Sequence, residues 1–323
     1  MCIVSHFITK PFIRLFNKEM QPNIVFSIII PQRNSLQTLS RLFASIPETD
    51  NIEIILVDNS PEPVTKEQVG INRDYQLLWS SPSRFAGGAR NEGMDHAQGK
   101  WLIFSDADDY FAPGAFDIFD QYKDSDADVI YFCADGVYPE TGERSEQADL
   151  YTQLVQNYLK DPSKEWGLRL SFHVPWAKMV RRSFVEEHHI RYDEVVANND
   201  DYFSLVSGYH AKKIEAVDRV VYFYVVSHGS LMRRRSLDVM RTRYEVILRC
   251  NHFKKQHGLG KYQGSVMYFL AESRHYGVKA MWEFFTMLFK YRQNPFIGMT
   301  NWFKTAKRIR NKEKKDARFI VNQ

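Results

Sequence analysis

The sequence predicts an α/β fold: a Rossmann-like, mostly parallel sheet followed by a C-terminal helical extension. Short, nearly continuous apolar segments alternate with segments whose apolar residues recur every three or four positions. This alternation is typical of βαβ units whose sheet is covered by helices on both faces. Beyond about Ser236 only helical periodicity remains. A chain of 323 residues can form one large or two medium domains with a substantial core.

The first hundred residues carry the clearest local signals. A helix capped by Asn34 or Ser35 and ended by Pro47 follows the first strand, and a second helix, Ala86–Ala97, is closed by Gly99. Strands are expected where β-branched and apolar residues run without interruption, at Ile24–Ile30, Ile52–Val57, Tyr75–Trp79 and Trp101–Ser105.

Later elements are spaced more widely. We expect a helix at Asp200–Tyr209, and strands at Asp128–Cys133, Trp176–Arg181 and Val220–Val226. We therefore divide the chain into an N-terminal extension (residues 1–23), an α/β domain (24–235) and a helical, basic and aromatic region (236–323).

The charge is distributed unevenly along the chain. The 43 basic and 39 acidic residues give a net charge of +4, but residues 104–149 hold thirteen acids and two bases. Residues 301–323 hold eight bases and two acids. A nucleic-acid-binding domain usually spreads its basic residues along one folded face. In this chain the acidic residues are concentrated in the middle and the basic residues at the C-terminal end, which argues against nucleic acid as a partner.

The composition predicts a cytoplasmic protein. The longest apolar run, Val220–Val226, is far shorter than the roughly 18 residues of a membrane span. Lys10 and Arg14 are not followed by the apolar region and cleavage site of a signal peptide. The cysteines are odd in number and far apart, which excludes a disulfide framework and a CxxC zinc site: Cys2, Cys133 and Cys250.

Two predicted strands end in acidic residues. Val57 is followed by Asp58, and Ser105 is followed by Asp106-Ala107-Asp108-Asp109. Ligands of such sheets bind at the carboxyl ends of the strands. Carboxylates there could hold Mg²⁺ or Mn²⁺, which would reverse the repulsion between the acids and a diphosphate. The alternative is that these acids cap the helix near Pro113.

A second acidic run, Asp124–Asp128, resembles the start of a calcium loop. It has Val129 where the sharp turn needs glycine, and Asp135 where the bidentate glutamate belongs. We interpret it as a solvated loop. The chain has no G-x-G-x-x-G after the first strand, no G-x-x-x-x-G-K-[ST] and no G-x-S-x-G. A dinucleotide fingerprint, a P-loop and a serine-hydrolase elbow are therefore excluded.

Several spaced motifs, read together, resemble the family 2 glycosyltransferases of GT-A fold over about residues 25–230. The opening motifs are Ser27-Ile28-Ile29-Ile30-Pro31, with Asn34, and Ile55-Leu56-Val57-Asp58-Asn59-Ser60. Two segments resemble the central signature of the family: Gly88–Gly93 and Ala97–Asp109 with Pro113. Three later segments extend the resemblance: Trp176–Lys178, Ile190–Glu194 and Asn199–Phe203.

The resemblance implies a nucleotide-sugar site. Asp58 would accept a hydrogen bond from the nucleotide base, and Arg33 stands where many relatives place an aromatic residue against that base. Asp106 would bind the ribose and the metal, and Asp108 the metal. The predicted nucleotide-sugar-binding residues are completed by Pro31, Arg84 and Arg233.

The resemblance also implies a general base and a third metal ligand. Asp200 corresponds to the base, which takes the proton of the acceptor hydroxyl. Because Asn199 replaces the usual glutamate and Asp201 follows, Asp201 is the fallback assignment. His228 would be a further metal ligand, and Arg233–Arg235 would bind the phosphates of the donor. The alternatives are a structural histidine and a solvated arginine loop.

The predicted activity is metal-dependent, inverting transfer of one sugar from a nucleotide-diphosphate sugar, UDP-sugar first, to a glycan or lipid-linked glycan. The Q-x-x-R-W signature of processive synthases is absent. The alternatives are a nucleotidyltransferase, whose glycine-rich loop is missing, and a non-catalytic binding module. The basic, aromatic C-terminal region is compatible with peripheral contact at the inner face of the plasma membrane. The favoured interpretation is that its aromatic residues pack on the catalytic domain and that only the end of the chain is solvated.

Overall fold

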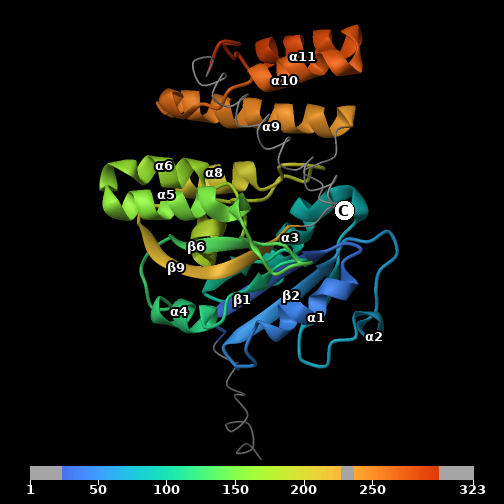
Figure 1. Ribbon diagram of the computed structural model, residues 1–323, viewed down its shortest axis with the longest axis vertical. Coiled ribbons are helices and arrows are strands. Elements are labelled where there is room, and N and C mark those ends of the chain that lie inside the picture. Colours follow the sequence, from blue (N-terminus) through green and yellow to red (C-terminus); the bar gives the residue numbers. More distant parts are fainter. Residues whose placement is uncertain (1–23, 227–235, 298–323) are drawn as a thin grey trace, which may run out of the picture.

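The computed structural model describes residues 24–226 and 236–297 (Figure 1). A single sheet of nine strands lies at its centre, in the order β3-β2-β1-β4-β8-β6-β9-β5, with β7 paired to β6. Helices cover the sheet, and three further helices, α9 to α11, stack above those that cover it (Figure 1).

The first four strands are all parallel and carry the N-terminal half of the sheet. They and their helices are β1 (Phe26–Gln32), α1 (Leu36–Ala44), β2 (Ile52–Asp58), α2 (Lys66–Val69), β3 (Gln76–Trp79), η1 (Pro82–Arg84), α3 (Phe85–His96) and β4 (Trp101–Phe104). Every residue of β1 is buried, as expected of a strand covered on both faces. A Cβ on Gly93 would lie 2.5 Å from Ile29 Cγ2, so this glycine lets α3 pack closely on β1.

The second half of the sheet is mixed. β8 runs antiparallel to both β4 and β6, whereas β6 and β9 are parallel. The elements are β5 (Tyr110–Phe111), α4 (Ala115–Gln121), β6 (Val129–Val137), β7 (Arg144–Ser145), η2 (Glu146–Ala148), α5 (Asp149–Lys160), η3 (Pro162–Lys164), α6 (Glu165–Ser171), β8 (Lys178–Arg181), α7 (Arg182–Glu187), α8 (Asp201–His210) and β9 (Ile214–Val225). β9 begins six residues before the predicted Val220 because its first half is amphipathic and not continuously apolar.

The C-terminal helices have a core of their own. They are α9 (Leu237–Gln256), η5 (Gly260–Tyr262), α10 (Met267–Glu272), η6 (Ser273–Tyr276) and α11 (Val278–Lys290). Met240, Tyr244 and Leu248 of α9 pack with Phe284 and Leu288 of α11. A separate apolar cluster joins α9 to the sheet domain through Leu170, Leu205, Val246, Cys250 and Leu259.

These helices lie on the α6–α8 side of the sheet domain, with α9 between α8 and the α10–α11 pair (Figure 1). Across residues 24–226 and 236–297, every helix is too short or too polar to span a bilayer.

Candidate functional site

The ends of β1 and β2 hold Asp58 in one orientation. Gln32 Nε2 donates to Asp58 Oδ1 at 2.8 Å, and the backbone nitrogens of Ser60 and Val64 donate to its two carboxylate oxygens at 3.1 and 2.9 Å. Asp58 is only 1% exposed. Pro31 is buried in β1 and Arg33 is exposed just beyond it. The predicted base-binding residues therefore lie at the ends of two neighbouring parallel strands.

Asp106 follows β4 and is bound by an arginine of α3. Arg90 Nη2 lies 2.5 Å from Asp106 Oδ1, while Arg90 Nη1 donates to Asn199 Oδ1 at 2.8 Å. Arg90 is 5% exposed, and its guanidinium lies 5.3 Å from the ring centroid of Tyr192. One buried cation thus joins the acidic strand end to the segment that precedes α8.

Arg90 was not among the predicted site residues. It lies within the Gly88–Gly93 motif, but a motif position alone does not reveal which acid an arginine will reach.

Asp109 anchors the acidic loop. Its carboxylate accepts hydrogen bonds from Tyr222 Oη at 2.8 Å and from the backbone nitrogen of Val225 at 2.7 Å, both on β9. The same Tyr222 oxygen accepts from the backbone nitrogen of Asp106 at 2.9 Å. Burial raises the pKa of Asp109 well above its ordinary value, and the charges of Asp108 and Asp106 add to the rise. Asp109 and Tyr222 therefore tie the acidic loop to β9.

Asp106 and Asp108 fit a divalent cation. Burial, together with the charge of the neighbouring Asp106 carboxylate, raises the pKa of Asp108 to about 6. A cation between two such carboxylates would relieve both effects. Within the described ranges no group of three or more His, Cys, Asp or Glu residues could hold a metal. A pair of carboxylates is nevertheless the usual protein share of a Mg²⁺ site completed by phosphates and water.

Three predicted features have different outcomes. His228 and the Arg233–Arg235 run lie outside the described residues. The Asp124–Asp128 run forms a surface loop in which Asp126 pairs with Lys213 and Asp128 accepts backbone hydrogen bonds.

The segment before α8 is held from the α3 side. Arg84, a predicted donor-binding residue, forms a two-point ion pair with Glu194 (3.0 and 2.8 Å) and contacts Glu92 at 3.0 Å. Asn91 exchanges two hydrogen bonds with the backbone of Tyr192 at 3.0 and 2.9 Å. A Cβ on Gly87 would lie 1.8 Å from the carbonyl oxygen of Asp193, so only glycine permits this close approach.

The same segment is held from the α9 side. Arg249 Nη2 contacts both carboxylate oxygens of Asp193, at 2.8 and 2.9 Å. Its guanidinium also lies 4.7 Å from the ring centroid of Tyr202 in α8. A helix of the C-terminal region therefore forms part of the support for the predicted base.

Charges at the sheet edge act on Asp200. Burial raises the pKa of Asp200, and the negative charges of Asp201 and Asp106 add to the rise. The positive charge of Arg90 opposes it. Lys178 belongs to the same surroundings: its Nζ donates to Ser204 Oγ at 2.9 Å, and burial lowers its pKa to about 7, an effect that Asp200 opposes. The charges that act on Asp200 thus include those of the acidic strand end.

Asp201 faces a different set of charges. Burial raises its pKa, while a hydrogen bond from Asn198 Nδ2 at 3.0 Å and the charges of Lys254 and Arg243 lower it. Lys254 and Arg243 both belong to α9. Different charges therefore act on the two consecutive acids: Arg90 and Asp106 on Asp200, and Lys254, Asp193 and Arg243 on Asp201.

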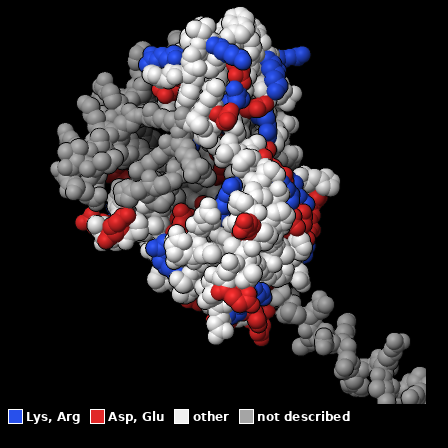
Figure 2. Space-filling view, turned by 90° about the vertical axis from the view of Figure 1, so that its right-hand side faces the viewer, with Lys and Arg blue, Asp and Glu red and all other residues white. Residues whose placement is uncertain are grey.

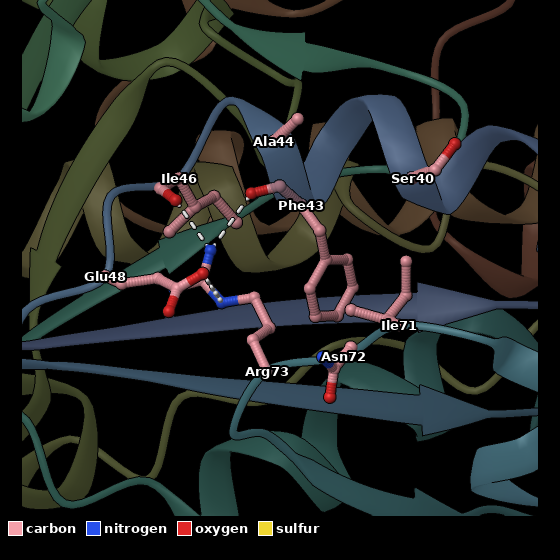
Figure 3. A pocket seen from close by; sticks show the side chains of 8 residues that line it. All are labelled: Ser40, Phe43, Ala44, Ile46, Glu48, Ile71, Asn72 and Arg73. Carbon is pink, nitrogen blue, oxygen red and sulfur yellow. Dashed lines mark hydrogen bonds and ion pairs between the residues drawn. The ribbon is translucent and has the colours of Figure 1, made fainter.

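A hollow of about 510 Å³ lies elsewhere, beside the end of α1 (Figure 3). Arg73 Nη1 donates to the carbonyl oxygens of Phe43 (3.0 Å) and Ile46 (2.6 Å), and its Nη2 to that of Pro47 (3.0 Å). The arginine thereby satisfies carbonyl groups at and just beyond the helix end. The hollow contains none of the predicted site residues, and we assign Arg73 a structural role.

The comparisons with known proteins agree with the predicted family. The model for the family described as glycosyl transferase family 2 matches residues 27–189, which is half of the chain. The structure is similar to that of S. aureus TarS 1–349 in complex with UDP-GlcNAc, with a TM-score of 0.54 and 18% sequence identity. The match covers 84% of this chain and 75% of that one. The likeness confirms the predicted GT-A fold.

Curated relatives match at lower coverage. EpsH of Bacillus subtilis is 24% identical over 198 residues, which are 57% of this chain and 55% of EpsH. The succinoglycan biosynthesis protein ExoO of Rhizobium meliloti is 25% identical over 231 residues, 67% of this chain and 64% of ExoO. The glycosyltransferase GlyG of Streptococcus pneumoniae is 26% identical over 243 residues, 69% of this chain and 75% of GlyG.

The chain thus spans between half and two thirds of the lengths of EpsH and ExoO. The family is established independently of that coverage, because its model matches half of the chain, in the region that carries Asp58, Arg90 and Asp106. The chain belongs to glycosyl transferase family 2.

Proposed function

We propose that the protein is a metal-dependent, inverting glycosyltransferase that moves one sugar from a UDP-sugar to a hydroxyl of a glycan or lipid-linked glycan. One observation carries the proposal. Arg90 contacts Asp106 at the acidic strand end and Asn199 beside Asp200, so it joins the predicted donor-binding acid to the predicted base.

The donor site uses the ends of β1, β2 and β4. Asp58, which is held by Gln32 and two backbone nitrogens, accepts a hydrogen bond from the nucleotide base. Pro31 and Arg33 lie at the end of the neighbouring strand. Asp106 serves the ribose and the metal. The ion pairs of Arg84 with Glu194 and Glu92 support a role in holding the segment before α8. Arg233 stays a prediction.

Asp106 and Asp108 would hold Mn²⁺ or Mg²⁺, with His228 as a further predicted ligand. When bound, the cation supplies positive charge to the diphosphate leaving group. The half-buried carboxylates of Asp106 and Asp108 and the buried one of Asp109 repel one another without it.

Asp200 acts as the base. The acceptor oxygen forms a bond to the anomeric carbon while its proton passes to the Asp200 carboxylate. The bond from the anomeric carbon to the diphosphate oxygen breaks, and its electron pair leaves with the diphosphate. One base on the face opposite the leaving group gives inversion. The raised pKa of Asp200 makes its carboxylate a better proton acceptor than an exposed aspartate.

The donor and acceptor classes have separate support. The UDP-GlcNAc complex of TarS supports a UDP-sugar, and the relative ExoO, a succinoglycan biosynthesis protein, supports a role in polysaccharide synthesis. A lipid-linked acceptor would place the enzyme at the inner face of the plasma membrane, and we propose a peripheral contact there through residues 236–323.

The proposal is tested by a donor screen with the full chain. UDP release from UDP-GlcNAc, UDP-glucose and UDP-galactose is measured with Mn²⁺, with Mg²⁺ and with a chelator. We expect metal-dependent release with at least one donor, and NMR of the transferred product should show an inverted anomeric configuration. Retention of configuration would contradict the single-base mechanism, and failure of all three donors to bind would contradict the UDP-sugar assignment.

A further inference from the structure

One helix of the C-terminal region exposes apolar side chains that its own core leaves out. The inner face of α11 packs Ala280, Phe284 and Leu288 against the rest of the chain, with Phe284 and Leu288 in the core shared with α9. Its outer stripe, spaced as on one helix face, consists of Val278, Met281, Trp282, Phe285 and Phe289. The outer stripe adjoins the inner face, so the apolar part of the helix is wider than the face that packs within the described chain.

The exposed side chains of the outer stripe are large and contiguous. Trp282 is 68% exposed, Phe289 69% and Phe285 42%. Their rings form a ladder, with centroids 6.0 Å apart between Trp282 and Phe285 and 5.3 Å apart between Phe285 and Phe289. Single exposed apolar residues are common on protein surfaces, but a continuous aromatic ladder marks an interaction site.

The charges around the outer stripe are mostly basic. Residues 263–297 contain four bases and two acids. One of the two acids, Glu283, is neutralised by Arg241 at 2.5 and 3.0 Å. Lys279 and Lys290 lie along one flank of the stripe and are exposed, although Lys290 also contacts Glu245 of α9 at 3.2 Å.

Lysine and arginine side chains, together with some acidic ones, are visible among uncharged side chains at the top of the molecule, where α10 and α11 lie (Figure 2). The sequence continues this bias, because residues 301–323 add eight bases and two acids. A second copy of this chain would bring the same positive charge to the surface and be repelled. An anionic bilayer has the complementary charge.

We infer that the outer stripe of α11 docks on an anionic membrane surface, with the aromatic side chains in the headgroup region and the basic side chains beside anionic lipids. Tryptophan and phenylalanine suit this boundary, and long lysine side chains can reach the headgroups from its edge. The inference deepens the peripheral contact of the proposed function and rests on it: it names the helix face that makes the contact.

The test compares two adjacent substitutions in the full chain. Phe285→Glu places a carboxylate inside the outer stripe, whereas Thr286→Glu places the same charge one position away, on the exposed side outside it. Flotation is measured with phosphatidylcholine vesicles, with and without phosphatidylglycerol. We expect wild type and Thr286→Glu to float with the anionic vesicles. The fraction of Phe285→Glu that floats should be at least about tenfold smaller. Circular dichroism checks that both variants are folded.

Three results would overturn the inference: no flotation of the wild type, equal flotation of the two variants, or a wild-type dimer that Phe285→Glu converts to a monomer while flotation persists. The last would assign the stripe to a second copy, and equal flotation would leave membrane binding to residues 298–323. UDP release measured without vesicles should be the same in both variants. The docking assay and the donor screen can therefore fail independently.

Discussion

The sheet edge and the C-terminal helices use charged residues in opposite ways. At the sheet edge, carboxylates are buried and held by a few donors, such as Gln32 on Asp58 and Arg90 on Asp106. In the C-terminal helices, Arg249 of α9 contacts Asp193 and other basic residues of α9 lower the pKa of Asp201, while α11 turns aromatic residues outward. The difference teaches that the C-terminal helices have two roles: α9 supports the site and α11 offers a surface.

The largest effect is expected at the metal acids. Asp108→Asn removes one of the two carboxylates that would hold the cation, so UDP release should fall by about 10³-fold, in line with the several kcal/mol that a metal contributes. A chelator should have the same effect on wild type and little further effect on the variant. Unchanged release in the variant would mean that the acidic strand end does not bind the metal.

The next largest effect is expected when Arg90 is substituted. Arg90→Met removes the buried cation between Asp106 and Asn199 and leaves the Asp106 carboxylate without its partner, which should lower kcat and the free energy of unfolding. The loss of unfolding free energy should be smaller than the roughly 3–5 kcal/mol of a fully buried pair, because the Asp106 side chain is 31% exposed. Because Arg90 lowers the pKa of Asp200, the acid limb of the kcat profile should move to higher pH. The matched control is Arg191→Met, whose ion pair with Asp95 is exposed. An acid limb at the same pH would contradict the coupling.

Arg249 tests whether α9 supports the site. Arg249→Met breaks the two contacts with Asp193 and should lower kcat about tenfold, with little change in the KM for the donor, because the segment before α8 loses one of its supports. Arg241→Met is the matched control: Arg241 is another α9 arginine with a two-point ion pair, but its partner is Glu283 of α11. Equal losses in the two variants would mean that α9 acts only through stability.

The smallest expected effect is the change in the free energy of unfolding with pH. Burial raises the folded pKa of Asp108 from 3.8 to about 6, so the folded state binds a proton more tightly than the unfolded state does. The metal-free protein should therefore lose stability as the pH rises from about 4 to 6, by at most about 1.4 kcal/mol per pKa unit. Urea unfolding of wild type and Asp108→Asn across this range, with and without Mn²⁺, isolates the contribution of Asp108 and its recovery. A difference between the two metal-free proteins that does not change with pH would contradict the raised pKa.

The sequence predicted the strand ends well and the tertiary contacts poorly. Asp58 and Asp106 could be placed together because both follow apolar strands of one parallel sheet. The ion pair between Arg249 and Asp193 joins residues 56 positions apart, and only the packing of α9 brings them together. β8 was expected as a strand, but its antiparallel direction has no local signal in four residues.

Asp200 and Asp201 show the same limit at the site itself. Adjacent residues at the start of a helix differ in direction by roughly a quarter turn or more, so a pattern of two acids cannot say which one faces the sheet. Their different neighbours, Arg90 and Asp106 for one and Lys254 and Arg243 for the other, come from helices that the sequence pattern does not position.

The most direct test of the account compares Asp200→Asn with Asp201→Asn in the full chain. Both substitutions remove one carboxylate and keep the size of the side chain. We predict that Asp200→Asn lowers the transfer rate at saturating donor by about 10²–10⁴-fold while UDP still binds, and that Asp201→Asn lowers it less than about tenfold. A larger loss in Asp201→Asn, or full transfer activity in Asp200→Asn, would contradict the assignment of Asp200 as the base.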